Sequence, residues 1–121
     1  MDTGILVVDD DELARIMMRD FLESVGQNVF LAEDELSALD ALHQKGELIR
    51  LVVTDYSMPR KGDGVRLFHC IKMIRPELPV VLLSGQEFDH DHEIHQVGFN
   101  GIEVKSSRRD SLMKFIMKYM A

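Results

Sequence analysis

The sequence predicts an α/β fold in which a five-stranded parallel sheet is doubly wound, with helices on both of its faces. Short runs of valine, isoleucine and leucine alternate with segments in which apolar residues recur at helical spacing, and this alternation is repeated five times. Continuous apolar runs of this kind are typical of strands that are buried on both faces. Parallel strands need crossover connections, and the helical segments supply them.

The first two strand–helix pairs lie near the N-terminus. Residues 5–8 form an apolar run, and the helix after it begins at Asp11, where acidic side chains favour the positive end of the helix dipole, and stops at Gly26. Residues 28–32 are the second strand, and the second helix spans about residues 33–46. The apolar faces of these helices are expected to be buried, and they comprise Leu13, Ile16, Met17, Phe21, Val25, Leu36, Leu39 and Leu42.

The third strand and its helix are joined by a loop that is rich in glycine. Residues 51–54 form the strand, and the loop covers residues 58–64. The helix halts before Pro76, because the residue that precedes a proline disfavours helical backbone. The apolar side of this helix is Val65, Phe68, Ile71 and Ile74.

The fourth pair has a weaker helical pattern. Pro79 introduces a strand at residues 80–83. Residues 88–97 are expected to form a helix in which only Ile94 and Val97 are buried. A fifth strand follows from about residue 100 to residue 104.

The last helix is predicted to begin at Ser107, with Asp110 in a capping-box-like arrangement, and to run to the chain end. Its apolar arc spans roughly 200° of the helical wheel, which is wider than a surface helix needs for its core. Methionine adapts to varied surfaces, so the methionine side is expected to contact a second copy, as in a homodimer, or a downstream partner. The alternative is a deeply covered helix. The methionines are Met113, Met117 and Met120.

Bulk composition limits the class of protein. With 121 residues the chain fits a single domain, residues 1–121. The net charge of −7 argues against direct nucleic-acid binding, because phosphate backbones are bound by clustered lysine and arginine. No apolar stretch approaches the ~20 residues that span a bilayer, so we expect no membrane segment and a cytoplasmic location. Cys70 is the only cysteine, which fits a reducing compartment, and we expect it to pack as a small hydrophobe.

Polar residues that suit phosphoryl chemistry stand where four of the predicted strands end. Asp9 and Asp10 follow the first strand, Asp55 the third, Ser84 the fourth and Lys105 the fifth. Open α/β sheets bind ligands at the carboxyl ends of their strands. These side chains are therefore expected to converge on one crevice.

The three carboxylates indicate a cation, because adjacent like charges are unfavourable unless something positive lies beside them. Mg²⁺ prefers oxygen ligands, so Asp9, Asp10 and Asp55 are a candidate Mg²⁺ site. Asp55 is also a candidate nucleophile, since carboxylates accept phosphoryl groups as acyl phosphates. Lys105 would contact the phosphoryl group as a point charge, and the Ser84 hydroxyl would contact it as a hydrogen-bond donor.

Over nearly its full length the sequence resembles the receiver domain of two-component response regulators. The resemblance rests on four blocks in the family's order, namely residues 5–11 (ILVVDDD), 53–59 (VTDYSMP), 83–85 (LSG) and 104–105 (VK). It implies a flavodoxin-like fold, similar to that of chemotaxis response regulators, with strand order 2-1-3-4-5.

The resemblance also implies a role for each site residue. Asp55 would be the phosphoacceptor, and Asp9 with Asp10 and the backbone carbonyl of Ser57 would hold Mg²⁺. The phosphoryl donor would be a sensor histidine kinase or a phosphotransfer protein. Self-catalysed transfer and autodephosphorylation would be the only reactions, so the chain is not expected to be an enzyme with a separate substrate. The contacts of the phosphoryl group would be Ser84, as the switch hydroxyl, and Lys105.

Two positions depart from the family's pattern. Ser106 follows the lysine where the family usually has proline, and Ile102 stands where it usually has phenylalanine or tyrosine. These departures motivate an alternative hypothesis, a receiver-like interaction module that works without phosphorylation. A Mg²⁺-dependent phosphohydrolase is less favoured, because the sequence has no obvious element that would select a small substrate.

Two further motifs have ordinary interpretations that we favour. Arg60 and Lys61 belong to loop 59–64, which we expect to be exposed and solvated, with a partner or phosphate contact as the alternative. The histidines of residues 89–95 suggest a transition-metal site, but in a helix only His92 and His95 would share a face. A solvated helix is therefore the preferred interpretation.

Overall fold

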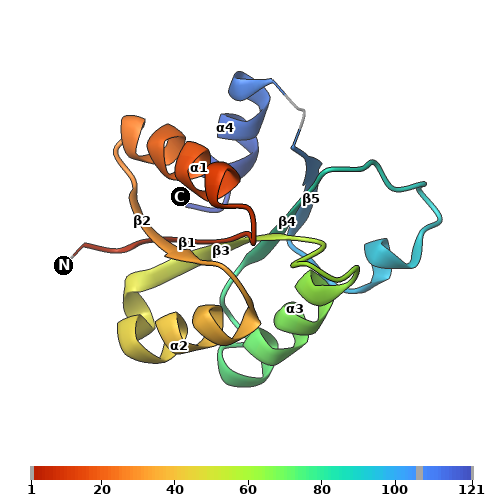
Figure 1. The fold of residues 1–121 in the computed structure, drawn as a ribbon, viewed down its shortest axis with the longest axis horizontal. Coiled ribbons are helices and arrows are strands. Elements are labelled where there is room, and N and C mark those ends of the chain that lie inside the picture. The colour runs from red at the N-terminus through yellow and green to blue at the C-terminus, as the bar shows by residue number, and fades with distance from the viewer. Residues whose placement is uncertain (1, 106–107, 121) are drawn as a thin grey trace.

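A computed structural model describes residues 2–105 and 108–120. Its five strands form one parallel sheet in the order β2-β1-β3-β4-β5, which confirms the predicted fold class and strand order (Figure 1). The strands are β1 (Gly4–Val8), β2 (Asn28–Ala32), β3 (Ile49–Asp55), β4 (Val80–Ser84) and β5 (Gly101–Val104). The helices are α1 (Glu12–Ser24), α2 (Glu35–Lys45), α3 (Asp63–Ile74) and α4 (Arg109–Met117), with short 3₁₀ helices η1 (Gly46–Leu48) and η2 (Glu93–Gln96).

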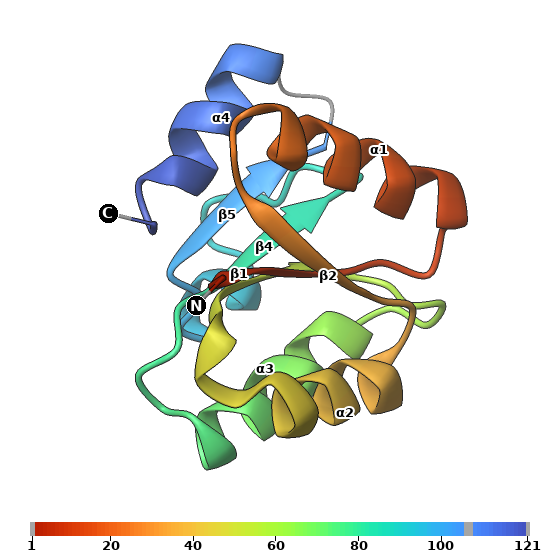
Figure 2. The ribbon, with the colours of Figure 1, turned by 90° about the vertical axis from the view of Figure 1, so that its left-hand side faces the viewer.

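The sheet is covered on both faces, with α1 and α4 on one side and α2 and α3 on the other (Figure 2). Alternate residues of a strand point to opposite faces, so each strand supplies both cores. In β1, Ile5 and Val7 pack toward α1 and α4, whereas Leu6 and Val8 pack toward α2 and α3. This double burial explains why the strands are continuous apolar runs.

Two helices begin where the sequence predicts them, because a side chain caps each one. The Asp11 carboxylate accepts a hydrogen bond from the backbone N–H of Leu13 and starts α1. Asp34 and Ser37 form a capping box at the start of α2. A side chain that satisfies a free N–H in the first turn stabilises a helix start by about 1 kcal/mol.

The predicted helix at residues 88–97 is wrong. Only η2 is helical there, and the residues before it are irregular. The ring of His92 accepts a hydrogen bond from Ile94 N–H, which caps η2 at that point. Phe88 packs its ring on that of Tyr56, with centroids 5.1 Å apart, so tertiary contacts and not helical amphipathicity place this segment.

Four apolar side chains that were expected to be buried are instead 57–80% exposed: Leu13, Met17, Leu36 and Ile74. Helical spacing shows which residues share a face, but it does not show where along the helix that face meets the sheet. Leu13 and Leu36 are the second residues of their helices and Ile74 is the last residue of α3, so these three lie at helix ends. In α1 the buried contacts come from Phe21 and Leu22.

The last helix is shorter than predicted. It begins at Arg109 and ends at Met117, and the expected start at Ser107 lies outside the described residues. Met113 and Met120 are half-buried and pack against the core on the α1 side, and Met117 is also half-buried. No helix among the described residues is long and apolar enough to cross a membrane.

Candidate functional site

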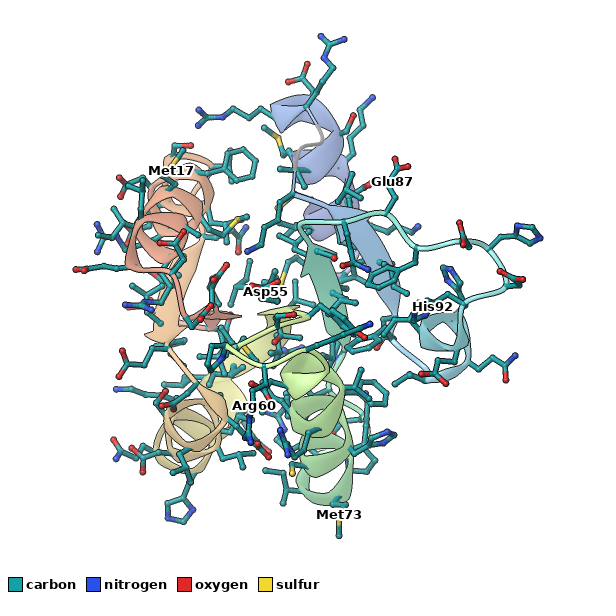
Figure 3. The ribbon with its side chains drawn as sticks, turned by 45° about the vertical axis from the view of Figure 1, so that its right-hand side comes forward. Met17, Asp55, Arg60, Met73, Glu87 and His92 are labelled. Carbon is teal, nitrogen blue, oxygen red and sulfur yellow. The ribbon has the colours of Figure 1, made fainter. Side chains whose placement is uncertain are left out.

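The carboxyl ends of the strands bring the candidate residues to one edge of the sheet. Asp9 and Lys105 directly follow β1 and β5, while Asp55 and Ser84 are the last residues of β3 and β4. Backbone hydrogen bonds continue past two of the strand ends, since Asp9 N–H donates to the Ala32 carbonyl and Lys105 N–H to the Ser84 carbonyl. Figure 3 shows Asp55 near the middle of this edge.

Lys105 joins two of the carboxylates. Its ammonium nitrogen lies 2.6 Å from Oδ2 of Asp9 and 3.1 Å from Oδ2 of Asp55. Burial lowers the pKa of Lys105, but the contacts with Asp9 and Asp55 outweigh burial and raise it above its ordinary value. The lysine is therefore a permanent positive charge at the site.

Asp55 is largely enclosed, with a side chain that is 13% exposed, and only Asp9 at 9% is more enclosed among these three residues. Burial raises the pKa of Asp55 and the neighbouring Asp9 adds to the rise, while the Lys105 charge opposes it. The Tyr56 backbone N–H donates to Oδ1 at 2.7 Å, which fixes the carboxylate orientation. The second oxygen, Oδ2, is the one that faces Lys105.

Three carboxylates can offer oxygens to one cation. Asp9, Asp10 and Asp55 each place a carboxylate oxygen within 4.8 Å of the others. Both the side chain and the backbone of Asp9 are held by hydrogen bonds. Its Oδ1 accepts from Asp11 N–H at 3.0 Å, and its backbone carbonyl accepts from the Arg15 guanidinium at 2.7 Å. Asp10 is exposed, so water can complete the coordination. An all-oxygen, partly solvated site suits Mg²⁺.

Ser84 and Ser57 both lie close to Asp55 along the chain or across the sheet. Ser84 is 1% exposed, and its hydroxyl oxygen accepts a hydrogen bond from Gln86 N–H at 3.1 Å. Ser84 follows Leu83, which pairs with Asp55 across the β3–β4 ladder, so the hydroxyl belongs to the strand end next to that carboxylate. Ser57 comes two residues after Asp55 at the start of the β3–α3 loop, where it pairs with Lys61 as an isolated bridge.

Asp63 and Gly64, the first two residues of α3, shape the junction between β3 and α3, and the sequence reasoning missed both. Gly64 N–H donates to the Tyr56 carbonyl, and a Cβ at position 64 would overlap the carbonyl oxygen of Asp55. Asp63 is buried and accepts hydrogen bonds from Arg60 N–H and the Arg66 guanidinium. The sequence did contain one signal, the Asp-Gly pair at the start of a helix. Such a pair is typical of a turn at which the backbone approaches another segment closely.

The loop cations are exposed as expected, whereas the histidines of residues 89–95 do not lie in the solvated helix that we preferred, because only η2 is helical there. Arg60 and Lys61 are exposed. In the described part of the chain, no group of three or more close metal-ligand side chains includes a histidine. His95 makes a local contact of its ring with the Asp89 carbonyl.

Cys70 is half-buried, as expected of a small packing residue. Its thiol donates a hydrogen bond to Oε1 of Glu35 at 3.3 Å. Burial and the Glu35 carboxylate raise the pKa of this thiol. A raised pKa disfavours the reactive thiolate.

Comparison with known proteins identifies the family. Residues 5–117 match the model of the response regulator receiver domain. The chain belongs to this family. A crystal structure of a response regulator receiver domain protein from Clostridium thermocellum superposes with a TM-score of 0.84 at 26% identity, covering 97% of this chain and 93% of that chain.

The sequence relatives of this receiver domain differ in length. It is 31% identical over 118 residues to an uncharacterized 14.6 kDa protein of Leptolyngbya boryana, covering 95% of this chain and 88% of that protein. It is 34% identical to the response regulator MprA of Mycobacterium sp. (strain KMS), covering 72% of this chain and 36% of MprA. It is 39% identical to the sensor histidine kinase RcsC of Salmonella typhimurium, covering 66% of this chain and 8% of RcsC.

Proposed function

We propose that this receiver domain accepts a phosphoryl group on Asp55 in a Mg²⁺-dependent reaction and thereby switches a surface that binds a partner. The observation that carries the proposal is the position of the Asp55 carboxylate, between the Lys105 ammonium and the acidic pair Asp9 and Asp10. A phosphoryl group on this carboxylate would lie beside the ammonium group and beside a site for a metal cation. Both positive charges would stabilise the negative charge of the phosphoryl group.

Each residue of the site has its own part in the proposed transfer. An Asp55 oxygen bonds to phosphorus while the bond between phosphorus and the donor nitrogen breaks, and that nitrogen takes a proton. Lys105 donates to a phosphoryl oxygen, and the Ser84 hydroxyl donates to another. Asp9, Asp10 and the Ser57 carbonyl, together with Asp55, would hold Mg²⁺, which neutralises charge on the transferring group.

The donor that we propose is the phosphohistidine of a sensor histidine kinase or of a phosphotransfer protein. Relatives of the chain include a response regulator and a sensor histidine kinase, which supports a place in a two-component system. We further propose that residues 1–121 act as one receiver domain in the cytoplasm. The relatives include both a protein of similar length and a longer response regulator.

Incubation with acetyl phosphate and Mg²⁺, followed by intact-mass measurement, tests the central proposal. We expect the mass of one phosphoryl group to appear, and we expect none without Mg²⁺ or in Asp55→Asn. The matched control is Asp40→Asn, which changes an exposed aspartate of α2 and is expected to leave the mass gain intact.

The same measurement, together with an assay of phosphate-monoester turnover, separates the rival functions. No mass gain would favour an interaction module that works without phosphorylation. A gain that persists in Asp55→Asn would show that another residue is the acceptor. Sustained turnover of a phosphate monoester would favour the phosphohydrolase.

The contact of the last helix with a second copy or a downstream partner stays a prediction. The partial exposure of Met113, Met117 and Met120 leaves some of their surface for a partner. Sedimentation at high concentration tests self-association, and kinase binding by Met113→Ser with Met117→Ser tests the partner. A monomer under all conditions with unchanged kinase binding would exclude this interface.

A further inference from the structure

A pocket of about 340 Å³ lies between α1 and α4, on the face of the sheet that these two helices cover (Figure 2). Its floor consists of Val7, Val53 and Leu83, one residue from each of β1, β3 and β4, and all three are at most 4% exposed. At one end the pocket reaches Asp55 and Lys105 of the candidate site. Most of its lining lies outside that site, and no step of the proposed phosphoryl transfer uses it.

The walls of the pocket are apolar. Phe21 and Met18 of α1 and Leu112 of α4 line it, and of these Phe21 is buried while the other two are half-buried. Met17 also lines it and is 62% exposed, so a ligand can enter from solvent on that side. An apolar cavity of about 150 Å³ can hold one benzene ring. A pocket of about 340 Å³ therefore has room for one ring and a short chain.

The charged residues that line the pocket differ in whether they contact an opposite charge. Asp9 and Asp55 both contact the Lys105 ammonium, at 2.6 Å and 3.1 Å. Arg109, the first residue of α4, is exposed, and its guanidinium carbon lies 4.8 Å from the centroid of the Phe21 ring. This arginine forms no ion pair within the part of the chain that the structure describes. A cation is thus available beside the apolar wall to pair with an anionic group.

We propose that this pocket binds a small amphipathic carboxylate, a molecule with a single ring or short aliphatic chain and one carboxylate group. The apolar part would pack among Phe21, Met18 and Leu112, and methionine adapts its shape to such a ligand. The carboxylate would accept hydrogen bonds from the Arg109 guanidinium, whose planar fork matches a carboxylate. The proposal concerns the pocket as it stands and does not depend on phosphorylation of Asp55.

Three probes that share one apolar body test the ligand class. They are phenylpropionate, phenylpropanol and phenylpropylamine, each with the phenyl group at the end of the chain, and they differ only in charge. Titration is followed by the methyl NMR signals of the methionines in the unphosphorylated protein. We expect phenylpropionate to bind with a Kd of about 1 mM or lower, about fivefold more tightly than the alcohol, and the amine to bind most weakly.

The methionines also report where the probe binds. Met17 and Met18 line the pocket, so their signals are expected to shift. Met58 is buried in the core on the α2 and α3 side, and Met73 is an exposed residue of α3. The signals of Met58 and Met73 are expected to stay unchanged.

Two neighbouring arginines provide a matched pair of variants. Arg109→Gln is expected to weaken phenylpropionate binding about fivefold, to the level of the alcohol, and to leave the binding of the alcohol unchanged. Arg109 is exposed and contacts Ser24 Oγ at 3.3 Å, so its replacement by glutamine is expected to preserve the fold. The control is Arg108→Gln, because Arg108 is exposed, precedes α4 and does not line the pocket. It changes the net charge equally and is expected to change binding less than twofold.

Four outcomes would overturn the proposal. Absence of phenylpropionate binding, or shifts of Met58 and Met73 in place of Met17 and Met18, would show that the pocket does not take this ligand. Amine binding as tight as that of the carboxylate would show that the acidic end of the pocket, and not Arg109, selects the ligand. An equal loss of binding in Arg108→Gln would show that the overall charge of the protein accounts for the preference.

Discussion

Lys105 places its ammonium group beside the two carboxylates that a divalent cation would also approach. It lies within 3.1 Å of an oxygen of both Asp9 and Asp55, so a cation that binds there meets an existing positive charge. Lys105→Met should therefore raise the Mg²⁺ affinity of the unphosphorylated protein. Removing a unit charge about 4 Å from a divalent cation is worth about 2 kcal/mol in water-like surroundings, or about thirtyfold in affinity.

Isothermal titration with Mg²⁺ measures this change in affinity. Lys118→Met is the matched control, because Lys118 is exposed just after α4 and its removal changes the net charge equally. We expect that control to bind Mg²⁺ as the parent protein does. Equal or weaker Mg²⁺ binding by Lys105→Met would show that the lysine does not compete with the cation.

The environment of Asp63 predicts that the free energy of unfolding depends on pH. Burial raises its pKa, but the hydrogen bonds from Arg60 N–H and Arg66, with the charges of both arginines, outweigh burial and hold the pKa below its ordinary value of 3.8. A lowered carboxyl pKa stabilises the folded state at pH values above 3.8, and that stabilisation is lost as the pH falls through the folded-state pKa.

Asp63→Asn should thus cost about 2 kcal/mol of unfolding free energy near neutral pH, because charge-assisted hydrogen bonds to a buried group are weakened. Urea unfolding at several pH values measures the cost, which should shrink as the solution becomes more acidic than pH 3.8. If the loss of unfolding free energy in Asp63→Asn does not vary with pH, its cause is the changed shape of the side chain and not the charge of Asp63.

At the scale of elements, the start of α3 is built against the end of β3. A Cβ at Gly64 would overlap the Asp55 carbonyl oxygen, so Gly64→Ala forces the helix away from the strand. We expect a loss of about 2 kcal/mol in unfolding free energy, together with slower phosphoryl uptake on Asp55. Gly85→Ala is the control, since a Cβ there meets nothing within 4 Å. Equal stability of the two variants would contradict this account of the contact.

The elements that the sequence predicts correctly have local causes. The caps Asp11 and Asp34 lie beside the turns that they satisfy, and an apolar run identifies a buried strand without reference to its neighbours. The segment 88–97 fails because its conformation depends on a contact between Phe88 and Tyr56, which are far apart in the sequence. Propensity over a short window does not contain that information.

The same distinction holds for the site. The grouping of Asp9, Asp55 and Lys105 follows from topology alone, because parallel strands end at one edge whatever their loops do. The burial of Asp63 depends instead on how the β3–α3 loop folds back to bring Arg60 N–H to the carboxylate. Such a contact cannot be predicted from the sequence pattern, because it exists only in the folded conformation of the loop.

At the scale of the whole molecule, the site links cation binding to folding. Asp9 and Asp10 follow β1 and Asp55 ends β3, so unfolding separates Asp55 from the other two carboxylates. In the folded protein their mutual repulsion is offset in part by Lys105. A cation that binds only the folded arrangement stabilises it by mass action.

Mg²⁺ should therefore raise the melting temperature. At a concentration of about one hundred times Kd the stabilisation is about 2.7 kcal/mol, which corresponds to a rise of about 10 °C for a domain of this size. Differential scanning fluorimetry measures the shift, with NaCl at equal ionic strength as the salt control and Asp10→Asn as a variant that removes one exposed ligand. We expect the shift to be much smaller in both. An equal rise with NaCl would assign the effect to screening of the −7 net charge, and an unchanged rise in Asp10→Asn would place the cation elsewhere.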